Sequence, residues 1–273
     1  MTKVIAALDN SLAARPVVAT AKALARILGS QVEALHIGED GDDVAKSAAD
    51  WAGLELRTLT GPTVERLVEE GSEDDVAALV VGARGTMPHP VGTTALELAK
   101  KLSRPLVVVP PDVERPDVLR RIVMPLEGSL SASLTPTEIL ELAEDTQLDV
   151  IAIHVLDETS LPAFNDQPQH EVREWAGEFV ARYCPVGVED VRLETRVGRR
   201  EEEILQATAE VEGDLIALGW SQELAPGRAP VVRAALERAH VPVLLVPVRL
   251  DEDAATASTE KEKPWSSWPS LPV

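Results

Sequence analysis

The fold is decided by residues 76–110, which read VAALVVGARGTMPHPVGTTALELAKKLSRPLVVVP. The pattern predicts a buried strand over 77–81, a glycine loop, a helix opened by Gly92, Thr93 and Thr94, and a second buried strand over 106–109. Pro105 ends the helix because proline cannot continue it. A strand, a glycine loop and a helix N-terminus together can hold an anion, since backbone N–H groups and the positive end of the helix dipole face the loop.

Two nucleotide motifs are excluded for this loop. No Lys-Ser/Thr pair follows the second glycine cluster, so the loop is not a P-loop. The glycine spacing is also wrong for a dinucleotide fingerprint. An ordinary βα loop, in which the glycines serve only for turning, therefore stays open beside the anion site.

The residues before this stretch alternate between strand and helix patterns. Strands are expected over 3–8, 32–37 and 54–59, and helices over 15–28, 42–51 and 62–70. The polar run from Asp9 to Ser11 suits a turn and a helix N-cap, and Gly29 and Gly71 are expected to end helices. The 54–59 segment alternates apolar and polar residues, which favours a sheet margin. This order predicts an α/β fold with a parallel sheet and helices on both faces.

The second half of the chain repeats the first. Residues 3–12 align with 121–130 at an offset of 118 (121 minus 3), and His36 then falls on His154. Gly82 falls on Gly219 at an offset of 137 (219 minus 82). The second copy therefore holds nineteen extra residues (137 minus 118), which we expect mostly in a loop over 157–168. Tandem duplication is the inference.

Length and composition limit the number of domains, the partners and the location of the protein. The 273 residues are enough for two domains, and the net charge of −20 with no basic patch argues against nucleic acid as a partner. No apolar run is long enough to span a membrane, and no signal peptide precedes the first strand, so a cytoplasmic protein is expected. The single cysteine, Cys184, excludes an internal disulfide and is expected to be a packed thiol.

The boundaries follow from composition shifts. We expect a first domain over 1–112, a short proline-bounded linker, a second domain over 117–248 and a disordered tail over 249–273. Trp265 and Trp268 are unusual in such a tail. The two final strands, 106–109 and 243–246, are strongly apolar, and each is expected to cover the margin of the other half's sheet.

The order of these motifs, found twice, resembles the universal stress protein family in its tandem two-domain form. The resemblance runs from about Lys3 to Val248 and rests on three features of each half. These are a first strand ending near an acidic residue and a serine, a second strand ending in His-Ile or His-Val, and a late glycine loop before the last helix and strand. It implies two Rossmann-like domains of the adenine nucleotide alpha hydrolase-like type, each a five-stranded parallel sheet flanked by helices.

The resemblance also implies a ligand and a site. In ATP-binding members, the residues at these positions point to Asp9 on the nucleoside and to the Ile37 backbone on adenine. The ribose and phosphates would contact the glycine loop and the helix start, which here comprise Gly82, Gly85, Gly92, Thr93 and Thr94. Mg²⁺ is expected only with ATP. The loop is shorter than in those members, and Pro88 and Pro90 each remove a backbone donor.

The second half departs further from the pattern. Glu127 stands in the place of Asp9, Gln222 stands in the place of Gly85, and Gly227-Arg228-Ala229-Pro230 replaces the Gly-Thr-Thr sequence. Trp220 is expected to fill the space that a ligand would take. We therefore place any nucleotide site in the first half.

No catalytic constellation is apparent, and His36 and His154 are expected to be packed imidazoles with one hydrogen bond each. The sequence thus predicts a stress-response module that binds an adenine nucleotide and is not an enzyme, with weak ATP hydrolysis left open. Its two halves would form an intramolecular pseudo-dimer, and a homodimer is also open. The alternative is an interaction scaffold without a nucleotide, working through its paired sheets and its tail.

Overall fold

The structure, a computed structural model, describes residues 2–38, 43–83, 92–126, 148–156, 191–222 and 229–247. In the first half the elements are β1 (Lys3–Ala7), α1 (Ala14–Ile27), β2 (Gln31–Ile37), α2 (Asp43–Trp51), β3 (Leu56–Leu59), α3 (Thr63–Gly71), β4 (Val76–Gly82), α4 (Thr93–Lys101) and β5 (Leu106–Val109). In the second half they are β6 (Arg121–Pro125), β7 (Asp149–Leu156), β8 (Val191–Val197), α7 (Arg200–Glu210), β9 (Leu215–Trp220), α8 (Pro230–Arg238) and β10 (Val243–Pro247).

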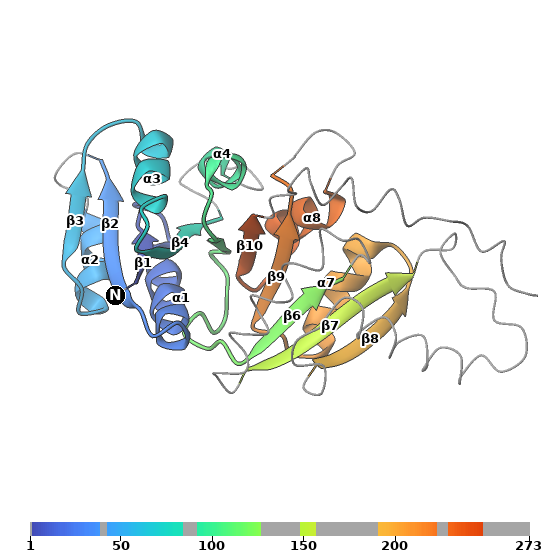
Figure 1. Cartoon of the computed structure of the whole chain (residues 1–273). Helices are drawn as coiled ribbons and strands as arrows, with labels where there is room; N and C mark the ends of the chain where they lie inside the picture. The colour runs from blue at the N-terminus through green and yellow to red at the C-terminus, as the bar shows by residue number, and fades with distance from the viewer. Residues whose placement is uncertain are drawn as a thin grey trace, which may run out of the picture.

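One ten-stranded sheet runs through both halves, in the order β3-β2-β1-β4-β5-β10-β9-β6-β7-β8 (Figure 1). Neighbouring strands are parallel within each half. At the junction β5 pairs antiparallel with β10, with Val107 opposite Leu244. The predicted α/β fold is confirmed, and the two five-stranded sheets are joined edge to edge. The predicted position of β3 at the sheet margin is also confirmed.

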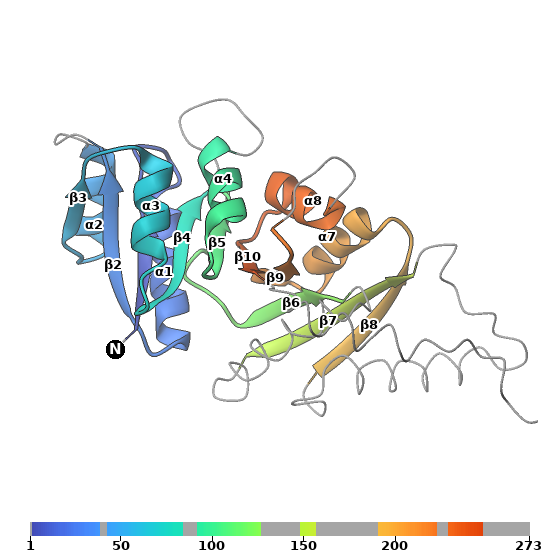
Figure 2. The same cartoon turned by 45° about the horizontal axis from the view of Figure 1, so that its top comes forward.

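In the first half helices cover both faces of the sheet, and in the second half the described helices α7 and α8 cover one face (Figure 2). In the first half α1 contacts α2 and α3 contacts α4, and in the second half α7 contacts α8. Successive residues of a strand point to opposite faces, so Val4 joins the apolar layer beneath α1 and α2 while Ile5 joins the layer beneath α3 and α4. Each layer contains strand residues from both halves.

The strand pairings of the two halves correspond at the offsets found in the sequence. Val4 pairs with Val32 and Ile122 with Val150, both shifted by 118 (122 minus 4). Leu79 N–H donates to Pro105 O at 3.0 Å, and Ile216 N–H donates to Pro242 O at the same 3.0 Å, a shift of 137 (216 minus 79). The sheet register of the second half is therefore that of the first.

Two helix ends differ from the predictions. Helix α1 begins at Ala14 with Ala13 at its N-cap and no side-chain cap, so the Asp9 to Ser11 run forms the turn but not the cap. Gly71 is the last residue of α3 and Ser72 is the C-cap. A Cβ atom on Gly71 would lie 2.9 Å from Leu102 Cδ1, so this glycine serves close packing of α3. Gly29 follows the α1 C-cap with φ of +58°, as predicted.

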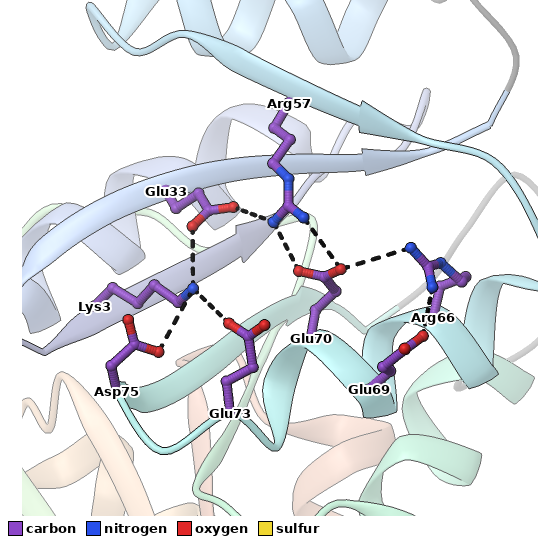
Figure 3. Close-up of polar contacts among 8 residues, drawn as sticks. All are labelled: Lys3, Glu33, Arg57, Arg66, Glu69, Glu70, Glu73 and Asp75. Atoms are coloured by element: carbon purple, nitrogen blue, oxygen red, sulfur yellow. Dashed lines mark hydrogen bonds and ion pairs between the residues drawn. The ribbon is translucent and has the colours of Figure 1, made fainter.

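An ion-pair network joins the amino ends of β1 and β2 to β3 and the end of α3 (Figure 3). Lys3 Nζ lies 2.7 Å from Glu73 and 3.5 Å from Glu33. Arg57 bridges Glu33 at 2.8 Å and Glu70 at 2.7 Å, and these two hydrogen bonds raise the pKa of Arg57. The network fixes α3 against the margin of the sheet.

Several predictions fall outside the described residues. These are the loop over 157–168, the tail over 249–273 with its two tryptophans, and the positions Gly85, Glu127 and Cys184. Within the described part of the chain, no helix is both long enough and apolar enough to cross a membrane.

Candidate functional site

Most of the predicted site residues lie at one edge of the first-half sheet. Strands β2, β1 and β4 are adjacent and parallel, so their carboxyl ends meet at the same edge. Ile37 ends β2, Gly82 ends β4, and Asp9 follows β1 between them. The strand order reverses between β1 and β4, and the crevice at such a switch point is where α/β sheets bind ligands.

Asp9 is held by a tight turn after β1. Its Oδ1 accepts hydrogen bonds from Ser11 N–H at 3.1 Å and from Ser11 Oγ at 2.5 Å. Asn10 Oδ1 accepts from Ala45 N–H at 3.3 Å, which ties the turn to α2. Within the described residues, both contacts of Asp9 use Oδ1, so there Oδ2 of this half-buried carboxylate keeps its capacity to accept from a ligand hydroxyl.

The Ile37 backbone lies just beyond the bonded part of β1. The described bonds between the two strands end with Leu8 N–H donating to Leu35 O at 2.8 Å. On the other side Gly38 N–H donates to Leu59 O at 2.9 Å, so β3 continues past this point while β1 turns away. Ile37 is half-buried and packs on the α3 and α4 layer, which leaves its backbone at the edge next to Asp9.

The glycine loop is closed at its base. Ala83 N–H donates to Val109 O at 2.7 Å, and Gly92 N–H donates to Ala83 O at 2.7 Å. The Gly92 N–H is therefore used within the protein, so Gly92 would act at a phosphate through its missing side chain and not as a donor. Gly85 lies outside the described residues.

Among the described residues, further donors at this edge belong to the first turn of α4. Gly92 is the N-cap and makes no side-chain cap bond, and the first helical bond runs from Leu96 N–H to Gly92 O at 3.2 Å. The N–H groups of Thr93, Thr94 and Ala95 have no partner within the helix, as in any first turn. Thr93 is exposed and Thr94 is half-buried, so their hydroxyls and N–H groups could reach an anion at this edge.

The corresponding edge of the second half has lost these features. Trp220 follows Gly219 and is 6% exposed, packed in the layer beneath α7 and α8. Pro230 is the first residue of α8, at the place of Thr93, and brings no N–H. Ala229, at the place of Gly92, has φ of +48°. This helix start therefore offers fewer donors to an anion than α4 does.

Gln222 has a role that sequence reasoning missed. Its Nε2 donates to Leu102 O at 2.6 Å and to Ala99 O at 3.3 Å, at the end of α4 in the other half of the chain. Its φ of +62° is a value that glycine adopts more easily, which fits its alignment with Gly85. No sequence signal could have found this contact, because the partners lie 120 and 123 positions away.

The two strand-end histidines are structural, as predicted. His36 Nδ1 donates to Leu8 O at 2.7 Å and His154 Nδ1 donates to Leu126 O at 2.7 Å, and both side chains are buried. Burial lowers the pKa of His154; the hydrogen bond to Leu126 opposes this, and the nearby Arg200 adds to it. Both rings fix the turn after the first strand of their half.

A dedicated metal site is absent from the part of the chain that the structure describes, where no group of three or more His, Cys, Asp or Glu side chains converges. Mg²⁺ at this edge would have to depend on the oxygens of a bound phosphate and on water.

Comparison with known proteins supports the fold. The sequence model of the universal stress protein family matches residues 119–247, the half with the weaker nucleotide motif. A universal stress protein from Archaeoglobus fulgidus is 15% identical, with a TM-score of 0.63 over 92% of this chain and 97% of that one. A functionally unknown protein from Pseudomonas aeruginosa is 13% identical, with a TM-score of 0.66 over 95% and 96%. No curated protein matches the chain.

Proposed function

Because residues 119–247 belong to the universal stress protein family, we propose that this chain is a tandem universal stress protein that binds an adenine nucleotide in its first half. The ligand is ATP, accompanied by Mg²⁺ on its phosphates. The protein serves in a stress response as a binding module, and its location is the cytoplasm. The two halves act as an intramolecular pseudo-dimer.

One observation carries this proposal: Asp9, Ile37 and Gly82 converge at the switch point of the first-half sheet, beside the uncapped first turn of α4. A carboxylate, a strand backbone and a helix N-terminus are what a ribose, a base and a phosphate respectively require. Adjacent strands are about 4.8 Å apart, so the three strand ends span roughly the length of a nucleoside.

The roles follow from the contacts. Asp9 Oδ2 accepts from the ribose, and the Ile37 backbone bonds the adenine edge. Gly82 and Gly85 let the loop approach the ligand, and Thr93 and Thr94 donate to the phosphates. Gly92 keeps the space beside Ala83 open while its own N–H closes the loop. Asp9, the one carboxylate among these groups, is assigned to the ribose and not to the phosphates, so the proposed activity is binding and not hydrolysis.

Native mass spectrometry of the freshly purified full chain tests the proposal. We expect co-purified ATP or AMP, and a rise in Tm when ATP with Mg²⁺ is added at about millimolar concentration. A bare chain with no rise in Tm would refute nucleotide binding.

Two matched variants locate the site. Asp9→Asn keeps an oxygen for Ser11 and removes the charge, and should weaken ATP binding about tenfold, the effect of roughly 1.4 kcal/mol. Glu127→Gln makes the same change at the corresponding position of the second half and should leave binding unaltered. Equal effects of the two variants would contradict the assignment to the first half.

The alternative, an interaction scaffold without nucleotide, is favoured by one observation. Gln222, which stands where the first half has a loop glycine, is used to hold α4 of the other half. Because this side chain contacts α4, its position contributes to the association of the two halves and not to binding a ligand. This alternative predicts that the bare chain retains full stability without ATP.

A further inference from the structure

A groove of about 410 Å³ opens at the opposite edge of the first half from Asp9 and Gly82. It lies between the ends of α1 and α2 and the start of β2; in Figure 1 this is the edge where β2 begins, away from its arrowhead. Ala19, Ala25, Val32 and Ala52 give it an apolar floor, and Trp51 lines it. Its volume lies in the range of small-molecule sites.

Three cations of α1 lie on the helix face toward this groove. Arg15, Lys22 and Arg26 are spaced by seven and four residues, which places them on one side of the helix. Lys22 Nζ donates to Ala52 O at 2.8 Å, and Arg26 Nη2 donates to Asp117 O at 2.9 Å. Each therefore uses one donor on a carbonyl and retains others.

These cations differ from several other cations of the first half, although Lys46 and Lys100 likewise form no ion pair within the described residues. Lys3, Arg57 and Arg104 each pair with a carboxylate. Within the described residues, Arg15, Lys22 and Arg26 form no ion pair, although the chain carries a net charge of −20. Among the described residues that line the groove, Asp117 is the one carboxylate, and it contacts Arg26 through its backbone oxygen.

Trp51 adds an aromatic surface to these charges. It is 58% exposed, an unusual position for so large an apolar side chain, and the Arg15 guanidinium carbon lies 5.9 Å from its ring centroid. An exposed ring beside two cations with free donors suits a ligand that is both planar and negatively charged.

We propose that this groove is a second binding site, for a small aromatic anion whose ring stacks on Trp51 and whose carboxylate or phosphate contacts Lys22 and Arg26. The limited volume favours a small molecule over an acidic peptide, which would need a longer groove. The site lies at the edge where first-half strands begin, so it does not depend on nucleotide binding where those strands end.

The test uses the ¹⁵N-labelled full chain and naphthalene-2-carboxylate as probe. The indole N–H signal of Trp51, assigned by Trp51→Phe, should shift saturably on addition of the probe. Naphthalen-2-ylmethanol, with the same ring and no charge, and cyclohexanecarboxylate, with the charge and no aromatic ring, should each bind at least about tenfold more weakly, a loss equal to one charged contact or one ring contact.

Matched charge reversals complete the test. The double variant Lys22→Glu with Arg26→Glu should weaken the probe by about tenfold or more. Lys46→Glu, an exposed reversal on α2 that does not line the groove, should change binding less than about twofold, because exposed charges are screened over about 8–10 Å. Equal binding of the uncharged alcohol, an equal loss in Lys46→Glu, or shifts centred on α4 or on the second half would each overturn the proposal.

Discussion

Replacing Gln222 by alanine tests whether the two halves support each other through this side chain. The substitution removes two hydrogen bonds from Nε2, at 2.6 Å to Leu102 O and at 3.3 Å to Ala99 O. A neutral hydrogen bond contributes about 0.5–1.5 kcal/mol, and the longer bond contributes less than the shorter one. We therefore expect the free energy of unfolding to fall by about 1–2 kcal/mol.

Gln222→Gly separates the contribution of the side-chain hydrogen bonds from the cost of the backbone conformation. It removes the same two bonds but relieves the cost of a φ of +62°, which is about 1 kcal/mol for a residue with a Cβ. The glycine variant should therefore be more stable than the alanine variant by about 1 kcal/mol. At an exposed position in a strand or a helix, the order would be the reverse, with the alanine variant more stable than the glycine variant.

Urea denaturation of the full chain measures both effects, and hydrogen exchange locates them. Amides at the end of α4, around Leu102, should exchange faster in both variants. Gln206→Ala is the control, since Gln206 Nε2 donates to Glu210 Oε1 on the exposed face of α7 and its loss should cost less than about 0.5 kcal/mol. If Gln222→Ala unfolds like the wild type, or Gln222→Gly is no better than Gln222→Ala, the reasoning is refuted.

Three further outcomes are expected. Glu70→Gln should lower the free energy of unfolding by about 1–2 kcal/mol in urea titrations at low salt, and by less at high salt. The reason is that the 7% exposed carboxylate pairs with the Arg57 guanidinium, which is 44% exposed and therefore partly screened by salt. A loss that does not depend on salt would contradict this. Burial lowers the pKa of His154, so the unfolded chain binds the extra proton and stability should fall as the pH drops below about 6.5. His154→Asn should flatten that pH profile while the exposed His240→Asn should not, and parallel profiles would refute the assignment. Gly213→Ala places a Cβ 2.7 Å from a buried valine methyl and should lower the free energy of unfolding by about 1–3 kcal/mol. In Gly29→Ala the new Cβ meets nothing within 4 Å, so this variant should lose only about 1 kcal/mol, for its φ of +58°. Equal Tm values for the two variants would show that the packing at Gly213 relaxes.

Much of the fold could be predicted from the sequence because its signals are local. The apolar run over 106–109 is a strand with every residue buried, since helices and neighbouring strands cover it on all sides. The alternation over 54–59 gave the position of β3 at the margin. The offsets of 118 and 137 gave the strand register of the second half, because equal spacing along two parallel strands preserves their pairing.

The contacts that could not be predicted join residues far apart in the chain. The network of Lys3, Arg57 and Glu70 depends on how α3 lies on the sheet margin, which no spacing encodes. The internal bond of the Gly92 N–H was missed for the same reason, since a glycine before a helix looks like a phosphate ligand whether or not its N–H is used. At the candidate site, the sequence therefore indicated which residues lie at this edge of the sheet, but not which of their N–H groups are used within the protein.

At the antiparallel pairing of β5 with β10, each half of the chain covers the sheet edge of the other half. Val107 and Val108 on one side, and Val243 and Leu244 on the other, would become the rim of a bare sheet if the chain were cut between the halves. An exposed edge strand of this kind, apolar and with unpaired backbone N–H and C=O groups, pairs readily with a strand of another chain. Severed halves would thus pair with each other or with copies of themselves, whereas in the intact chain the connection through residues 111–120 makes this pairing intramolecular.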